Sequence, residues 1–129
     1  MIRFLHVMLR VIDLERSIEF YTKVFLLNIV RRSDYPDRKF SLVFLGYGTE
    51  EKDIIIELTY NWSPIKYEIG NGFGHIAFSV PDIYVLCDRA KTYGATIRRE
   101  PGLLRTSGGK DVAFICDPDG YIIEIIQGS

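Results

Sequence analysis

The chain contains only two histidines, and each of them begins a segment of the same design. His6 is followed by Val-Met-Leu-Arg-Val-Ile-Asp-Leu, and His75 by Ile-Ala-Phe-Ser-Val-Pro-Asp-Ile. Each half also carries a glutamate in an apolar run: Glu57 in Ile-Ile-Ile-Glu-Leu-Thr and Glu124 in Tyr-Ile-Ile-Glu-Ile-Ile. Imidazoles and carboxylates are plausible ligands for a borderline or hard divalent metal. The pattern therefore indicates an internal duplication with one His and one Glu per copy.

Each of these residue types has a simpler explanation when it occurs alone. A single strand histidine is usually a hydrogen-bonded core residue, and a single strand glutamate usually faces solvent. Glu124, however, lies between Ile122 and Ile126 on its strand face, where losing hydration is costly without a partner. Because His and Glu recur at equivalent places in both copies, we favour metal binding.

A set of two His and two Glu also limits which metal and which chemistry to expect. Four protein ligands and two waters complete an octahedron, which suits Ni²⁺, Co²⁺ or Mn²⁺, whereas Zn²⁺ usually prefers four ligands. Such an ion is a Lewis acid with exchangeable positions that can hold two neighbouring substrate oxygens and stabilise an enediolate. A displaced carboxylate can then act as the base.

Hydrophobic periodicity predicts the order β-α-β-β-β in the first copy. Alternation predicts strands over 4–11, 27–32, 40–45 and 54–60. Asp13 is a natural N-cap for a helix whose apolar face comprises Leu14, Ile18, Tyr21 and Phe25. Turn-forming residues at 34–37 and 46–48 separate the later strands.

The second copy repeats this order after a linker over 61–73 that contains Pro64. We expect a strand over 74–80, a helix beginning after Asp82 and ending near Gly94, and strands near 95–99, 111–116 and 121–126. Residues 100–110 are glycine-rich and indicate a mobile loop, whereas Asp-Pro-Asp-Gly at 117–120 indicates a tight turn.

The predicted fold class is α+β, with two tandem βαβββ modules whose mixed sheets curl into a trough. We expect a single domain over 1–129, with one module over about 1–60 and the other over about 74–129. The first and last strands of each module carry the candidate ligands, so the trough would contain the metal site.

Composition excludes several other classes of function. The net charge is −1 and there is no long basic run, which argues against binding to nucleic acid or an anionic membrane. No apolar stretch is long enough for a transmembrane helix, and no signal-peptide pattern is evident. Cys87 and Cys116 have no metal or redox spacing and are expected to be buried free thiols, so a cytoplasmic location is expected.

Together, these residues resemble the glyoxalase I (lactoylglutathione lyase) family of the vicinal-oxygen-chelate superfamily, which is built from paired βαβββ modules. The resemblance covers nearly the whole chain. The matching runs are His6-Val-Met-Leu-Arg-Val, Arg16-Ser-Ile-Glu-Phe-Tyr-Thr-Lys-Val, Phe44-Leu-Gly-Tyr-Gly, Glu57-Leu-Thr-Tyr-Asn-Trp, Gly74-His-Ile-Ala and Asp117-Pro-Asp-Gly-Tyr-Ile-Ile-Glu. Glu-Leu-Thr-Tyr-Asn-Trp and Asp-Pro-Asp-Gly-Tyr are specific in combination, although neither would decide the family alone.

The resemblance implies a methylglyoxal-detoxifying enzyme with glutathione as co-substrate. Such an enzyme isomerises the methylglyoxal–glutathione hemithioacetal to S-lactoylglutathione through a metal-bound enediolate. His6, Glu57, His75 and Glu124 match the family's metal ligands. Glu124 matches the principal base, with Glu57 as its partner. The short chain favours nickel or cobalt, and the family's sites form at a homodimer interface, where His6 and Glu57 of one chain would meet His75 and Glu124 of the other.

The resemblance also implies residues that recognise the thiol. Arg10 and Asn61 match positions that hold the γ-glutamyl end of glutathione, although Arg10 could instead form a surface ion pair. Some members have an arginine where this chain has Asn71, so we consider Arg98, Arg99 and Lys110 as cations for the glycyl carboxylate. The usual glycine after the first helix is also absent, which leaves the helix exit at 24–27 open.

Other members of the superfamily are the alternatives. A methylmalonyl-CoA epimerase should lack the Glu-Leu-Thr-Tyr-Asn-Trp run and needs a coenzyme A groove, for which the sequence has no signature. A fosfomycin-type thiol transferase normally uses three protein ligands, so Glu57 argues against it. A metal-free drug-binding module does not need two His and two Glu. Glutathione could also be replaced by a related thiol such as trypanothione.

Overall fold

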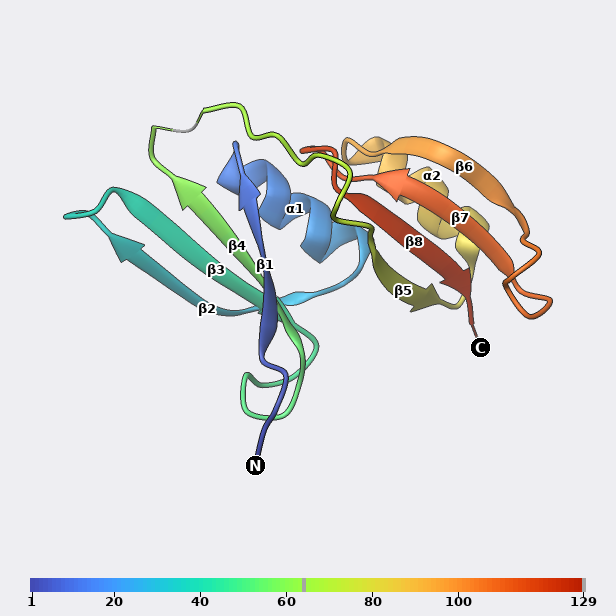
Figure 1. The fold of residues 1–129 in the computed structure, drawn as a ribbon, viewed down its shortest axis with the longest axis horizontal. Helices are drawn as coiled ribbons and strands as arrows, with labels where there is room; N and C mark the ends of the chain where they lie inside the picture. The colour runs from blue at the N-terminus through green and yellow to red at the C-terminus, as the bar shows by residue number, and fades with distance from the viewer. Residues whose placement is uncertain (64, 129) are drawn as a thin grey trace. The chain divides into compact units, whose positions relative to one another are not determined.

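The computed structural model describes residues 1–63 and 65–128 and divides the chain into two compact units, Met1–Tyr67 and Glu68–Ser129. Each unit contains one helix and a four-stranded mixed sheet (Figure 1). The predicted α+β class and the duplicated βαβββ order are therefore confirmed. The joining of the sheets into a single domain with a trough stays a prediction, and Pro64 of the predicted linker lies outside the described residues.

The first unit contains β1 (His6–Val11), α1 (Leu14–Val24), β2 (Asn28–Tyr35), β3 (Phe40–Gly46) and β4 (Ile55–Asn61). Its strands lie in the order β1-β4-β3-β2, with β1 parallel to β4 and the other pairs antiparallel. Asp13 caps α1 as predicted, because its carboxylate accepts a hydrogen bond from the Arg16 amide at 3.1 Å.

The second unit contains β5 (Ile76–Val80), α2 (Ile83–Thr92), β6 (Thr96–Leu103), β7 (Asp111–Cys116) and β8 (Ile122–Gln127). Its strand order, β5-β8-β7-β6, repeats that of the first unit, again with the first and last strands parallel. The Asp82 carboxylate caps α2 by accepting from the Tyr84 and Val85 amides. The order of the strands, which the sequence did not reveal, is thus the same in both copies.

Strand alternation gives each sheet one face against its helix and one face for polar side chains. In the first unit, Leu9, Val43 and Leu58 are buried on the same side as the apolar face of α1. Ile115, Ile123 and Ile125 are fully buried in the second unit. His6, Glu57 and Glu124 occupy the other faces, away from these cores.

Two boundaries differ from the sequence predictions. Residues 100–103 were expected to belong to a loop, but they extend β6 to Leu103 because they pair with β7 beyond a register shift between Arg99 and Gly102. The bulge accommodates Pro101, which has no amide hydrogen to donate to a sheet. The turn expected at 34–37 instead covers 36–39, because β2 remains paired with β3 through Tyr35.

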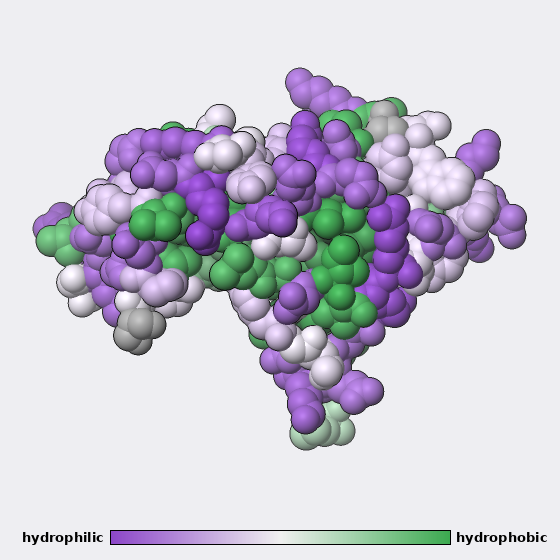
Figure 2. All heavy atoms as spheres, turned by 180° about the vertical axis from the view of Figure 1, so that it is seen from behind, coloured by the Kyte–Doolittle hydropathy of each residue, from purple (hydrophilic) through white to green (hydrophobic). Residues whose placement is uncertain are grey.

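Cys116 also differs from expectation, because it is half-buried, whereas Cys87 is buried; both are free cysteines. Many large apolar side chains remain on the surface, and Figure 2 shows them gathered between hydrophilic ones on the face that it presents. Within the described residues, no helix has the length and apolar character needed to cross a membrane.

Both helices end through a residue in the left-handed region. Gly94 has a φ of 103°, as predicted for the end of α2, and Ala95 N–H then donates to Ala90 O. After α1 the same place is taken by Leu26, with a φ of 58°. The first helix therefore exits without a glycine, at the cost of a strained leucine that is 64% exposed.

We expect Leu26→Gly to raise the free energy of unfolding by about 0.5–1 kcal/mol, because the relief of left-handed strain exceeds the added freedom of the unfolded chain. Gly94→Ala should lower it by about 1 kcal/mol for the reciprocal reason. Urea unfolding followed by circular dichroism measures both. Equal stability of Leu26→Gly and the wild type would show that the strain at Leu26 is negligible.

Candidate metal and substrate site

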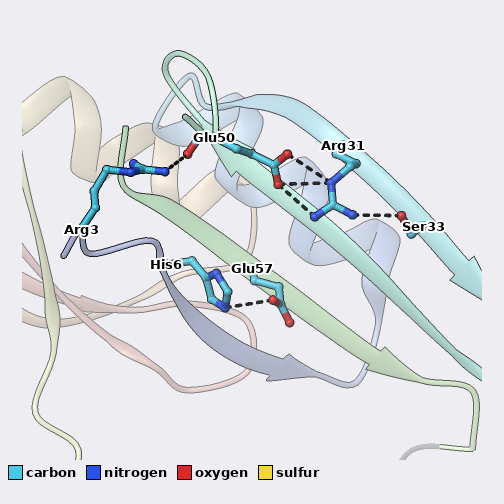
Figure 3. A network of polar contacts seen from close by, with 6 residues as sticks. All are labelled: Arg3, His6, Arg31, Ser33, Glu50 and Glu57. Atoms are coloured by element: carbon cyan, nitrogen blue, oxygen red, sulfur yellow. Dashed lines mark hydrogen bonds and ion pairs between the residues drawn. The ribbon is translucent and has the colours of Figure 1, made fainter. Parts of the chain in front are cut away.

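The first candidate pair lies on the parallel strands β1 and β4. His6 is the first residue of β1, and Glu57 lies in β4 opposite Met8, so both side chains point from the same face of the sheet. Their Nε2 and Oε1 atoms are 3.1 Å apart (Figure 3). The Glu57 side chain is 13% exposed and that of His6 is 38% exposed, so the carboxylate is the deeper of the two.

The second pair repeats this arrangement in the second unit. His75 directly precedes β5, and Glu124 lies in β8 opposite Ala77. The distance from His75 Nε2 to Glu124 Oε1 is 3.5 Å. The carboxylate is again less exposed than the imidazole, at 22% against 41%. The structure therefore brings the four predicted ligands together as two equivalent pairs.

A phenylalanine supports each histidine. Phe44 lies opposite Glu57 in the β3–β4 register, and its ring meets the His6 ring edge-on at a centroid distance of 6.0 Å. Phe114 stands in the same relation to Glu124, and its ring is 5.5 Å from that of His75. These distances fall within the usual range for interacting rings. Neither aromatic residue was predicted from the sequence to belong to the site, although Phe44 begins one of the matching runs; the strand register reveals their place.

The two pairs have the spacing that two ligands of one ion require. Ligands about 2.1 Å from an ion and at right angles to each other lie about 3 Å apart, close to both observed distances. Glu57 is also oriented by Thr59, whose hydroxyl donates to Glu57 Oε2 at 2.9 Å. A hydrogen bond of this kind fixes a carboxylate ligand for metal binding. Nitrogen and oxygen donors without sulfur fit a borderline or hard divalent cation.

Neither pair forms a complete ligand set within its unit. Within residues 1–63 and 65–128, no group of three or more His, Cys, Asp and Glu side chains is positioned to hold a metal. Each unit contains two of the four predicted ligands.

Arg10 and Asn61 lie on the same sheet face as Glu57. Arg10 is opposite Thr59 in the β1–β4 register, and Asn61 follows Glu57 by four residues, roughly 13 Å along the strand. The Asn61 amide donates to the Tyr67 hydroxyl at 2.8 Å. Both predicted thiol-binding residues thus share the face of the first pair, displaced along the strands from its carboxylate.

The three candidate cations of the second unit lie in different environments. Arg98 lines a cavity of about 420 Å³ together with Asn71, Phe73 and His75, and none of the residues that line this cavity is acidic. The Arg99 guanidinium donates to the carbonyls of Glu100, Gly102, Leu103 and Val112. Lys110 is exposed immediately before β7. Only Arg98 combines closeness to His75 with an open guanidinium.

The comparisons with known proteins agree with this geometry. The model of the Glyoxalase/Bleomycin resistance protein/Dioxygenase superfamily matches residues 3–125. A probable lactoylglutathione lyase of Synechocystis sp. is 50% identical over 125 residues, covering 97% of this chain and 95% of the relative. The lactoylglutathione lyase of Escherichia coli O157:H7 is 49% identical, covering 97% of this chain and 92% of its own. The chain therefore belongs to this superfamily.

Solved structures place it among the glyoxalase I folds. Glyoxalase I from Zea mays superposes with a TM-score of 0.90 at 45% identity, and the match covers 98% of this chain. The chain spans only 45% of the maize chain. A trypanothione-dependent glyoxalase I from Leishmania major has a TM-score of 0.82 at 40% identity, covering 98% of this chain and 87% of its own.

The arrangement of the first pair predicts the effect of removing one ligand. We expect Glu57→Gln to weaken Ni²⁺ binding by more than about 100-fold, because losing a ligand should exceed the 10- to 100-fold cost of losing a ligand's hydrogen-bond partner. Competition with a chelating dye measures the affinity. Glu51→Gln, on the exposed loop before β4, is the matched control and should bind as the wild type does. Equal affinities of the two variants would exclude Glu57 as a ligand.

Proposed function

We propose that the protein is a metal-dependent lactoylglutathione lyase that converts the hemithioacetal of methylglyoxal and glutathione to S-lactoylglutathione. The observation that carries the proposal is the pair of matching His–Glu contacts, 3.1 and 3.5 Å long, at equivalent places in the two units. Near-full-length relatives at about half identity bear the name of this enzyme. The epimerase, the thiol transferase and the drug-binding module gain no support from these relatives.

We propose that His6, Glu57, His75 and Glu124 hold one divalent ion. The donors are two nitrogens and two carboxylates with no sulfur, which suits Ni²⁺, Co²⁺ or Mn²⁺. The resemblance of the short chain favours Ni²⁺, and Co²⁺, Mn²⁺ or Zn²⁺ are the alternatives. Two carboxylates balance the charge of the ion. When bound, the ion supplies Lewis-acid polarisation of the two neighbouring substrate oxygens.

We propose a homodimer in which each site combines pairs from two chains. Each unit supplies two ligands, and the described residues contain no three-ligand group, so a complete set requires two units to contribute. His6 and Glu57 of one chain would join His75 and Glu124 of the other. Phe4 and Leu5, which precede His6, are 60% and 53% exposed and offer apolar surface for such an interface.

Glu124 is proposed as the catalytic base. Its carboxylate removes the proton from the substrate carbon that bears sulfur and returns it to the adjacent carbon, while the hydroxyl and carbonyl exchange places. The substrate and product are isomers, so no oxidant or reductant is required. Glu124 is more exposed than Glu57, which favours Glu124 for the transfer and leaves Glu57, oriented by Thr59, as its partner.

Recognition of the thiol is proposed to use both units. Arg10 offers paired donors to the γ-glutamyl carboxylate, and Asn61 offers a donor and an acceptor. Arg98 is the preferred partner for the glycyl carboxylate because it lines the cavity at His75. Arg99 is less suited because its donors are occupied by carbonyls, and Lys110 remains an alternative.

We propose that the enzyme works in the cytoplasm. Both cysteines are free and Cys87 is buried, where its pKa is raised mainly by desolvation, so little reactive thiolate forms at neutral pH. Free thiols are typical of a reducing compartment.

The activity is tested by reconstituting the apo-protein with each of the four metals and following thioester formation from methylglyoxal and glutathione. We expect turnover to be highest with Ni²⁺. Replacing glutathione by trypanothione in the same assay identifies the thiol. Absence of turnover with every metal and both thiols would reject the proposal.

Glu124→Gln should lower kcat by at least about 100-fold while the protein stays folded, because general-base catalysis contributes 10²- to 10⁴-fold and the amide cannot accept the proton. Turnover of the Ni²⁺-loaded variant and its circular dichroism spectrum measure both effects. Glu68→Gln is the control for a glutamate outside the site. Wild-type turnover of Glu124→Gln would exclude it as the base.

Arg10→Ala should raise the KM for the glutathione hemithioacetal by about tenfold, with a smaller change in kcat, because a charge-assisted hydrogen bond to the substrate is lost. Arg98→Ala should have the same effect, and Arg105→Ala is a surface control in the same unit. Unchanged KM values would remove the corresponding arginine from the thiol site.

A further inference from the structure

A surface loop of the first unit binds Arg31, an arginine that lines the same cavity as His6. The β3–β4 connection runs over 47–54 and is longer than its equivalent over 117–121 in the second unit. From this loop the Glu50 carboxylate accepts from Arg31 Nε at 3.2 Å and from Arg31 Nη2 at 3.0 Å (Figure 3). Arg3 donates to the Glu50 carbonyl and so ties the loop to the N-terminal segment.

Arg31 connects this loop to the histidine through an aromatic ring. Its guanidinium carbon lies 4.0 Å from the centre of the Phe44 ring, which in turn meets the His6 ring edge-on. Arg31, His6, Phe44 and Glu50 also line one cavity of about 200 Å³. The planar cation therefore covers one face of Phe44.

In the second unit, the arginine at the equivalent place has different hydrogen-bond partners. Arg99 occupies the place equivalent to Arg31, because each is opposite the supporting phenylalanine and each follows a register shift in its strand. Arg99 is fixed by backbone carbonyls, with Val112 O at 2.6 Å and Leu103 O at 2.8 Å. Arg31 depends instead on the side chain of Glu50, which is 37% exposed.

We propose that Arg31, oriented by Glu50, is a positioning residue that fixes the Phe44 ring and through it the imidazole of His6. This inference rests on the proposed function, because its purpose is to prepare His6 as a metal ligand. Loss of the Glu50 carboxylate leaves the guanidinium with the longer hydrogen bond from Nη1 to Ser33 Oγ, at 3.3 Å (Figure 3). A less firmly held guanidinium gives the Phe44 ring, and with it the His6 imidazole, more freedom to move. At the equivalent place in the second unit, Arg99 is bound by backbone carbonyls instead of by a side-chain carboxylate.

The hydrogen bonds from Arg31 to Glu50 raise the pKa of the guanidinium, so Arg31 keeps its charge. Ionic strength is a condition that affects this link. The pair lies at the surface and is screened by salt, whereas the bonds of Arg99 go to uncharged carbonyls and depend less on ionic strength.

A matched ion pair on the same strand provides the control. Arg32 follows Arg31, is similarly exposed, and binds Glu15 at 2.9 Å, but its side chain points to the opposite face of the sheet. The experiment compares Glu50→Gln and Arg31→Met with Glu15→Gln and Arg32→Met. Ni²⁺ affinity is measured by dye competition, and the ligand geometry by the visible absorption spectrum of the Co²⁺-loaded protein.

We expect Glu50→Gln and Arg31→Met to weaken Ni²⁺ binding by about threefold to tenfold and to alter the cobalt spectrum. This loss is smaller than the roughly 10- to 100-fold cost of removing a ligand's direct hydrogen-bond partner, because Arg31 acts through the Phe44 ring. The controls should change neither. If Arg31→Met fails to fold, Glu50→Gln still tests the proposal, because it alters only one carboxylate on a surface loop.

If Glu50→Gln has the same cobalt spectrum and Ni²⁺ affinity as the unaltered protein, the positioning role of Arg31 is overturned. The proposed function would still hold, provided that the unaltered protein binds Ni²⁺ and turns over substrate. Equal losses in both ion pairs would also overturn it, because the effect would then be general destabilisation. A wild-type protein that binds no Ni²⁺ would overturn both this inference and the proposed function.

Discussion

The site depends on parallel pairing of the first and last strands in each unit. In a parallel ladder, paired residues point to the same face, so a histidine at the start of one strand meets a glutamate two residues along the other. This register places a carboxylate beside an imidazole on a face that the helix does not cover. The carboxylate is too shielded to rely on water, and its partners in the structure are the imidazole and, for Glu57, the Thr59 hydroxyl. The same geometry places the carboxylate where the proposed metal ion would need it.

Much of the fold was predictable because the βαβββ pattern occurs twice in the sequence. The elements were identified from alternation, helical periodicity and caps such as Asp13 and Asp82, and all were found within a few residues of their expected positions. The extension of β6 was missed because Pro101 and Gly102 usually end strands. Here a register shift allows them to continue pairing. Leu26 could not be predicted either, because leucine rarely adopts the left-handed backbone that it has here.

The candidate ligands were also evident from sequence, but their supporting residues were not. Phe44, Phe114 and Thr59 have no distinctive spacing, and they become part of the site only through strand register. Arg31 and Arg99 illustrate the same limit. Both are ordinary strand arginines in the sequence, and the structure shows that one is bound by a loop carboxylate and the other by backbone carbonyls. At the candidate site, the two copies therefore differ in how the residues around each histidine are held.

The separation of the ligands into two pairs has a genetic consequence. If the pairs combine across two chains as proposed, a chain altered at His6 and a chain altered at His75 would each be inactive alone. A mixed assembly of the two would place both defects in one site and leave the other site with all four native ligands. Two null alleles of this gene would then complement each other when expressed together.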